Sequence, residues 1–184
     1  MIALSDHIQL QALTLSNHTE VYQLMQKVYT PAYGHYWEDQ GKWYLEEQYG
    51  FDQFKSELEE NNSKYYLINY CQNQQPSGLP IGIFKYNSHA KYPPLPDYRS
   101  FKVHRLYLEA NFQGNGIGKL VMAYAQNVAI KEKHQLIWLE AMDTHLQAQS
   151  FYRELGFVKT QSRLLAFKLM RDEHRQIWYL HKKL

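Results

Sequence analysis

A glycine-rich turn at residues 113–118 places the strongest constraint on how this chain folds. The turn reads Gln-Gly-Asn-Gly-Ile-Gly. It follows the apolar run at 103–108 and opens a segment whose apolar residues share one helical face. The first N–H groups of a helix have no partner within the helix, and they lie at the positive end of its dipole. The sequence therefore predicts a strand, a turn and a helix in succession, with an anion site at the turn.

The helix after this turn is the best-patterned one in the sequence. Its apolar residues fall at positions 117, 120, 121, 124, 125 and 128, which form one continuous stripe. A short apolar strand is predicted at 136–141. A further helix begins in the capping-box sequence at 144–147 and ends before Gly156. A strand–helix–strand unit in the middle of the chain predicts a right-handed crossover and a parallel strand pair.

Hydrophobic periodicity predicts the remaining elements. A first helix is expected to end at Pro31, and a second helical stretch within 37–60 is expected to break near Gly50. Residues 72–78 are predicted to form a hairpin loop, and a proline-rich loop is predicted at 87–99. The predicted strands lie at 7–13, 64–71, 79–86, 101–109, 158–170 and 176–182. Hairpins on both sides of the parallel pair give a mixed α/β sheet, which we expect to form one domain over 1–184.

Composition limits the class of function. The 184 residues carry a net charge of +2, without the strongly basic footprint of a nucleic-acid-binding domain. The single cysteine, Cys71, allows no intramolecular disulfide, as is typical of a reducing compartment. No apolar stretch approaches ~18 residues and the N-terminus lacks a signal-peptide core, so we expect a cytoplasmic protein without a membrane partner.

The glycine spacing discriminates between kinds of anion loop. A nucleoside-triphosphate loop requires G-x-x-x-x-G-K-[ST], but Gln113 and Leu120 stand at two of its defining positions. A dinucleotide loop requires G-x-G-x-x-G, and only 66 residues follow Gly118, too few for the rest of a doubly wound sheet. A plain tight turn needs fewer glycines, since each costs roughly 1 kcal/mol inside a helix.

Two motifs stand in this part of the sequence, Gln113-x-x-Gly116-x-Gly118 and, downstream, Ala148-x-x-Phe151-Tyr152-x-x-x-Gly156-Phe157. With these motifs the sequence resembles the GNAT (GCN5-related) N-acetyltransferase family. The first has the form of that family's pyrophosphate loop for coenzyme A, Q/R-x-x-G-x-G/A, and the second is similar to its second signature. The two motifs are specific in this order and about 35 residues apart. The resemblance is strong over 101–157, and the element order extends it over most of the chain.

This resemblance implies a GNAT-like fold and an activity. The fold is a twisted, mostly antiparallel sheet with a central splayed parallel strand pair and about four flanking helices. The activity is transfer of an acetyl group from acetyl-CoA to a primary amine by direct attack, without a metal. A bulge in the strand at 101–109 is implied to aim an N–H at the thioester carbonyl. The implied coenzyme contacts are Leu106, Tyr107, Leu108, Gln113, Gly114, Asn115, Gly116, Ile117, Gly118, Lys119, His145 and Gln149.

His145 stands where the family often has Asn, so Gln149, one turn later, is a substitute for that contact. Tyr152 matches the family's general-acid tyrosine, which protonates the departing thiolate. From spacing alone, a packing role for Tyr152 beside Phe151 is the simpler interpretation. The candidate bases are His104, Glu109 and Glu140, although such groups are more often solvated or paired. Regular strand alternation predicts His104 on the face of Leu106 and Leu108.

An aromatic and acidic segment at 33–39 is the candidate acceptor region, with Tyr33, Tyr36, Trp37 and Glu38 as substrate contacts. Aromatic faces and carboxylates suit a cationic amine. The layout is similar to bacterial polyamine acetyltransferases, which favours a small amine or polyamine. A helix packed on the sheet with a solvated acidic edge is an equally simple interpretation. A peptide or protein N-terminal acetyltransferase and a catalytically silent acyl-CoA-binding module are the alternatives. Dimers are common in the family, so a homodimer is compatible with the resemblance.

Overall fold

The structure, a computed structural model, describes residues 1–71 and 78–184. The hairpin loop predicted at 72–78 therefore lies almost entirely outside the described residues. The elements in chain order are β1 (Ile2–Ala3), β2 (Ile8–Ala12), α1 (His18–Tyr33), α2 (Lys42–Tyr49), α3 (Phe51–Glu59), β3 (Ser63–Tyr70), β4 (Leu79–Asn87), β5 (Ser100–Leu108), α4 (Ile117–Lys131), β6 (Leu136–Met142), α5 (Leu146–Glu154), β7 (Val158–Leu164) and β8 (Gln176–Lys183).

The strands form one sheet in the order β1-β2-β3-β4-β5-β6-β8-β7. The pair β5 and β6 is parallel and the other neighbours are antiparallel, which confirms the predicted mixed, mostly antiparallel sheet. Parallel pairing covers Ser100 to Lys102 on β5 and Leu136 to Trp138 on β6. Beyond Lys102 the two strands separate, because β6 continues beside β8 while β5 continues beside β4.

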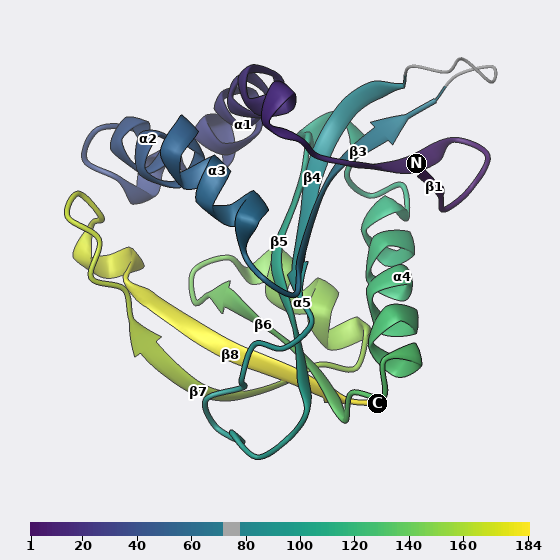
Figure 1. Cartoon of the computed structure of the whole chain (residues 1–184). Helices are drawn as coiled ribbons and strands as arrows, with labels where there is room; N and C mark the ends of the chain where they lie inside the picture. The colour runs from purple at the N-terminus through teal and green to yellow at the C-terminus, as the bar shows by residue number, and fades with distance from the viewer. Residues whose placement is uncertain (72–77) are drawn as a thin grey trace.

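Helices cover both faces of the sheet, with α1–α3 on one side of β3–β5 and α4 on the other (Figure 1). Most of the predicted stripe on α4 packs against the sheet, with Ile117, Val121 and Ala125 buried, whereas Leu120 is exposed. The other face is built around α1–α3 and is rich in aromatic side chains, including the fully buried Trp37 and Tyr49. None of the helices in the described ranges is long and apolar enough to cross a membrane.

Two predicted boundaries were wrong. The helix α1 runs through Pro31 to Tyr33, because a proline in the last turn removes only one hydrogen bond of the helix. The strand predicted at 158–170 ends at Leu164, and the chain then crosses back toward Trp37, where Met170 forms an isolated bridge. The predicted interruption at Gly50 is confirmed, since α2 ends and α3 begins on either side of it.

A bulge in β5 corrects the predicted orientation of His104. Lys85 pairs with Arg105 and Tyr86 with Val103, so His104 is an extra residue on β5. Val103 therefore belongs to the same core cluster as Leu106, although the two are an odd number of positions apart. Regular alternation fails at this point because a bulge inserts one residue into the pleat.

Candidate active site

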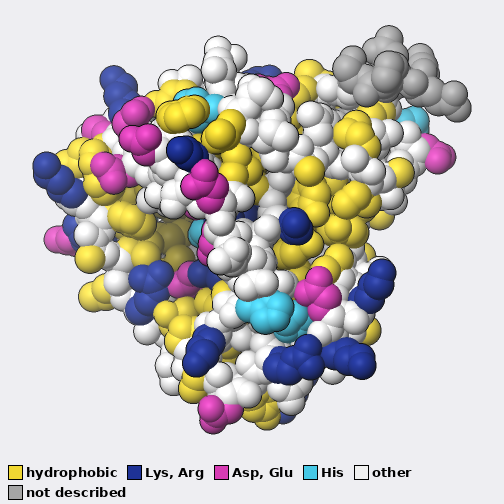
Figure 2. All heavy atoms as spheres, viewed as in Figure 1, with side chains coloured by type: hydrophobic (Ala, Val, Ile, Leu, Met, Phe, Trp, Pro, Cys, Tyr) yellow, Lys and Arg dark blue, Asp and Glu magenta, His cyan; other side chains and the backbone are white. Residues whose placement is uncertain are grey.

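A cavity of about 710 Å³ opens where β5 and β6 separate. Its mouth is visible as a hollow at the left of Figure 2, bordered by hydrophobic and charged side chains. One set of lining residues comes from the glycine turn and α5, and another comes from α1, α2 and the segment after β7. The cavity therefore brings the two sequence motifs together with the aromatic segment at 33–37. The main members of these sets are Gln113, Gly114, Gly116, Gly118, Phe151 and Tyr152, and Tyr29, Tyr33, Tyr36, Trp37, Tyr44 and Phe167.

The glycine turn presents free backbone donors to this cavity. Gly114 and Gly116 both have φ near +77°, a conformation that side-chain-bearing residues rarely adopt. The amides of residues 114–118 donate no hydrogen bond to another described residue. A Cβ built at Gly114 or Gly116 would meet no atom within 4 Å, so space for a ligand lies beside the backbone. This arrangement, at the start of the 15-residue helix α4, fits a pyrophosphate group.

The other predicted coenzyme contacts differ in how they face the cavity. Leu106, Tyr107, Leu108 and Lys119 line it, as does Gln113, whose side-chain amide donates to the carbonyl oxygen of Leu108 at 2.9 Å. Among the described lining residues, the side chains of Asn115 and Ile117 do not appear, so only their backbone amides remain as predicted contacts. Ile117 is instead a core residue.

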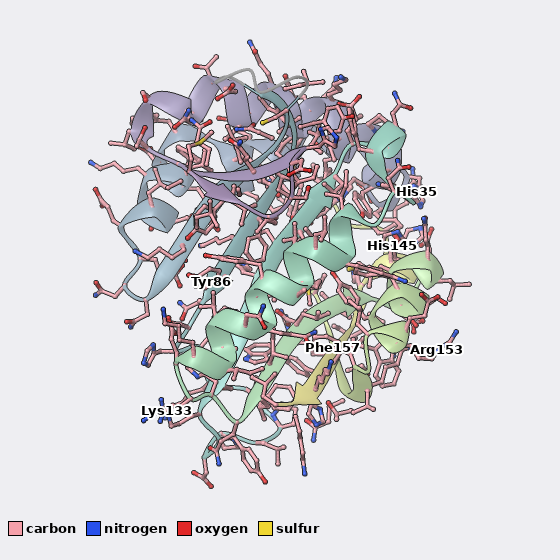
Figure 3. The ribbon with its side chains drawn as sticks, turned by 90° about the vertical axis from the view of Figure 1, so that its right-hand side faces the viewer. His35, Tyr86, Lys133, His145, Arg153 and Phe157 are labelled. Atoms are coloured by element: carbon pink, nitrogen blue, oxygen red, sulfur yellow. The ribbon has the colours of Figure 1, made fainter. Side chains whose placement is uncertain are left out.

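His145 and Gln149 are also distinguished by the structure. His145 precedes α5, lines the cavity and packs edge-on against Tyr33 with ring centroids 5.3 Å apart. Burial and the nearby His35 lower the pKa of His145, and the two histidines lie near one another in Figure 3. Gln149 is not among the described lining residues. Its amide donates to the carbonyl oxygens of Met142 and Asp143, at 2.8 and 2.6 Å, and so holds the start of α5 to the end of β6.

Tyr152 lies on α5 and faces the cavity. Its ring packs against those of Phe151 and Phe157, with centroids 5.1 and 5.8 Å apart. Its hydroxyl forms no hydrogen bond with another described residue, so it is available to a ligand. Burial raises the pKa of Tyr152 to about 12, so the phenol keeps its proton at neutral pH. Tyr152 thus packs against the core with its ring and also lines the cavity.

Two of the three candidate bases are carboxylates held by cations. Glu140 lines the cavity and accepts from Lys102 at 2.8 Å and from Arg163 at 2.9 Å. Although burial alone would raise the pKa of Glu140, these two cations lower it below its usual range. Glu109 pairs with Lys27 at 2.9 Å and is not among the described lining residues.

His104, the third candidate, occupies the β5 bulge and lines the cavity. Its side chain is open to the cavity but is surrounded by protein, and burial lowers its pKa. The cations Arg105, Lys85 and Lys102 lower that pKa further. His104 is therefore a neutral ring that can hydrogen-bond a ligand, and it binds a proton only weakly.

The predicted substrate contacts Tyr33, Tyr36 and Trp37 line the cavity, whereas Glu38 is not among the described lining residues. The neighbouring Asp39 is used for structure, since it accepts hydrogen bonds from the amides of Gly41 and Trp43 and so supports the start of α2. The acidic part of the segment thus does not reach the cavity. Three aromatic side chains that were not predicted do reach it: Tyr29, Tyr44 and Phe167.

A buried charged network behind the β5 bulge was also not predicted. Arg105 donates to Glu57 of α3 at 2.7 and 3.3 Å, and to the hydroxyl of Tyr49 at 2.9 Å. Lys85 of β4 lies 3.4 Å from the same carboxylate and 2.7 Å from Glu60. The two cations and the two carboxylates balance in charge, and their contacts join α3 to the two strands beside the cavity. The signal in the sequence was weak: Lys85 and Arg105 are charged residues within predicted strands.

Comparisons with known proteins agree with this geometry. A sequence model of the acetyltransferase (GNAT) family matches residues 19–157. An uncharacterized N-acetyltransferase of the pepI 3′ region of Lactobacillus delbrueckii subsp. lactis is 23% identical over 146 residues, which cover 79% of this chain and 78% of that protein.

Solved structures share the fold at low identity. The ribosomal L7/L12 α-N-protein acetyltransferase RimL with coenzyme A has a TM-score of 0.71 at 18% identity, over 100% of this chain and 97% of that one. The spermidine N-acetyltransferase of Vibrio cholerae with coenzyme A and spermine has a TM-score of 0.68 at 15% identity, over 97% and 96%. The chain therefore belongs to the acetyltransferase (GNAT) family and is an acetyl-CoA-dependent acyltransferase.

Proposed function

We propose that this protein transfers the acetyl group of acetyl-CoA to a small primary amine by direct attack of the amine on the thioester. One observation carries the proposal: the same cavity is lined by the glycine turn, with its free amides, and by Tyr152, with its unpartnered phenol. The first suits the pyrophosphate of the coenzyme and the second suits its departing sulfur. The separation of β5 from β6 provides space for the pantetheine arm along Leu106–Leu108.

In the proposed reaction, the lone pair of the neutral amine attacks the thioester carbonyl carbon. A C–N bond forms, and the carbonyl oxygen takes negative charge. We assign the stabilisation of this charge to the backbone N–H of His104, the extra residue of the β5 bulge. The C–S bond then breaks, and the thiolate takes the proton of Tyr152. The nitrogen loses one proton to water, from which Tyr152 regains its own. The products are the acetylated amine and coenzyme A.

The proposal requires no strong base in the cavity. Arg163 and Lys102 lie on either side of Glu140, and Arg105 follows His104 on β5. Positive charge near a bound ammonium favours loss of its proton. The paired state of Glu140 and the low pKa of His104 are compatible with this route. We therefore assign proton removal to water and give neither side chain the role of base.

Release of free thiol from acetyl-CoA, measured against a panel of small amines, aminoglycosides, amino acids and peptides, tests the proposal. We expect turnover with small amines and slower turnover with peptide N-termini. Intact-protein mass after mixing with acetyl-CoA alone should remain unchanged, since direct attack forms no acetyl-enzyme. An acetylated protein that passes its acetyl group to an added amine would contradict direct attack. Coenzyme binding without turnover of any amine would indicate a silent binding module.

A further inference from the structure

We infer that the acceptor is a monoamine attached to an uncharged aromatic or similarly flat apolar group, and that polyamines are poor acceptors. This inference rests on the proposed acetyl transfer and concerns the half of the cavity away from the glycine turn. It follows from two independent features of that half, its wall of rings and its balance of charge.

The wall of this half consists of the part-buried rings of Tyr44 and Phe167, which pack against the buried rings of Trp37 and Tyr29. Tyr44 stacks on Tyr29 with ring centroids 4.6 Å apart and contacts Trp37 at 4.7 Å. Phe167, from the segment after β7, lies 5.7 Å from Trp37 and 5.6 Å from Tyr44. The indole N–H of Trp37 donates to the hydroxyl of Tyr29 at 3.0 Å, so the rings keep their orientation. A preformed apolar wall of this kind favours a flat apolar ligand.

The charges in this half do not suit a polycation. Two carboxylates are found among the described lining residues. Glu154 pairs with Lys119 beside the glycine turn, so Glu140 is the one that remains for the acceptor half, and it has two cationic partners. Glu140 is shared by Lys102 and Arg163, which leaves that group with a formal charge of +1. A polyamine carries several ammonium groups, and each would need an unpaired carboxylate or water. The ring faces can hold one ammonium, but they provide no partner for the others.

Arg163 offers a direct way to test the charge argument. Its side chain is 45% exposed, so its replacement is compatible with folding. Arg163→Glu would turn the local charge from +1 to −1. Lys159→Glu is the matched control, because Lys159 lies on the same strand and carries the same charge but is not among the described lining residues.

The experiment compares kcat/KM for 2-phenylethylamine, n-butylamine and spermidine in the wild type and both variants. We expect the wild type to prefer 2-phenylethylamine to n-butylamine and to prefer either to spermidine by at least about tenfold. Arg163→Glu should raise the ratio of kcat/KM for spermidine to kcat/KM for 2-phenylethylamine about tenfold, because an effect on amine deprotonation is common to both substrates. Lys159→Glu should leave this ratio unchanged. Spermidine as the best wild-type acceptor, or an unchanged ratio in Arg163→Glu, would overturn the inference.

Calorimetric binding of the same amines to the protein saturated with coenzyme A separates this inference from the proposed function. Tighter binding of 2-phenylethylamine than of spermidine supports the inference even when no amine is acetylated. Tighter binding of spermidine overturns it. If spermidine were the one amine to be acetylated, the proposed acetyl transfer would stand, and the inferred class of acceptor would be wrong.

Discussion

Gly118 lies directly against the ring of Phe151: a Cβ atom built on Gly118 would come within 3.1 Å of Cζ of Phe151. This contact joins the two motifs that are separated in the sequence. The third glycine of the turn therefore has a packing role, because it lets α5 approach the start of α4. Tyr152, the next residue after Phe151, depends on that approach for its place in the cavity.

A double-mutant cycle tests this contact. Gly118→Ala should crowd Phe151 and destabilise the protein by about 1 to 2 kcal/mol, a cost that exceeds any gain in helix propensity. Combination with Phe151→Leu should remove part of the cost, giving a coupling free energy of at least about 0.5 kcal/mol in urea unfolding. Additive effects would show that the two residues do not press on one another.

Removal of the Tyr152 hydroxyl tests the general acid. Tyr152→Phe keeps the ring contacts with Phe151 and Phe157 and should lower kcat by about 10²-fold or more. The dissociation constant of coenzyme A should change less than about threefold, since the hydroxyl acts on the departing sulfur. Tyr98→Phe, in a loop away from the described cavity lining, is the matched control and should change neither value. Equal losses of kcat and coenzyme affinity would point to a packing role for Tyr152.

The pH dependence follows from the raised pKa of Tyr152, which is about 12. A raised pKa keeps the acidic form present at every pH below it, so ionisation of Tyr152 cannot reduce activity in the neutral or mildly alkaline range. We expect kcat/KM to rise with pH up to about pH 10, as the free amine loses its proton. A falling limb below that pH in the wild type, absent from Tyr152→Phe, would contradict the raised pKa of Tyr152.

The glycine turn can be tested with alanine at a position where φ is positive. Gly116→Ala should cost about 1 kcal/mol of stability and should weaken coenzyme A binding at least tenfold, because its Cβ would enter the open space beside the amides. Gly156→Ala shares the positive φ, near +86°, but this residue does not line the described cavity. It should therefore lose similar stability and leave the coenzyme dissociation constant unchanged. If both variants bound coenzyme A with similar affinity, the glycine turn would not be part of the coenzyme site.

The buried carboxylate of Glu57 is expected to hold the fold together behind the cavity. Glu57→Gln removes the charge that faces Arg105 and Lys85, whose side chains are 3% and 1% exposed, and should cost about 3 to 5 kcal/mol. Denaturant unfolding measures the loss. Glu59→Gln, exposed on the same helix, should change stability by less than about 0.5 kcal/mol. A loss at Glu57 no larger than at Glu59 would mean that the network is not stabilising.

Local patterns were sufficient for much of the fold and part of the site. The stripe on α4 and the glycine turn are signals within a few residues of one another, and each predicted its element. The helix α5 begins within the predicted segment, but its N-cap is His145, whose side chain makes no capping hydrogen bond. The aromatic residues Tyr33, Tyr36 and Trp37 line the cavity because they lie at or just after the end of α1, which packs beside β5.

Features that depend on distant partners were not predictable from these patterns. The bulge at His104 results from pairing with β4, and a single strand contains no sign of that register. The ion pairs of Glu140 involve Lys102 and Arg163, which are far apart in the sequence. Candidate bases therefore looked free in the sequence when their side chains were already paired or desolvated. The network around Glu57 was not predicted for the same reason, because its members come from distant parts of the sequence.

The most direct test of the account measures both products of one reaction. Acetyl-CoA labelled in the acetyl group is mixed with 2-phenylethylamine and the protein, and the labelled amide and the free thiol are quantified over time. The account predicts that both form in equal amounts and that both rates fall together in Tyr152→Phe. Thiol release without a labelled amide, or amide formation that does not depend on Tyr152, would contradict it.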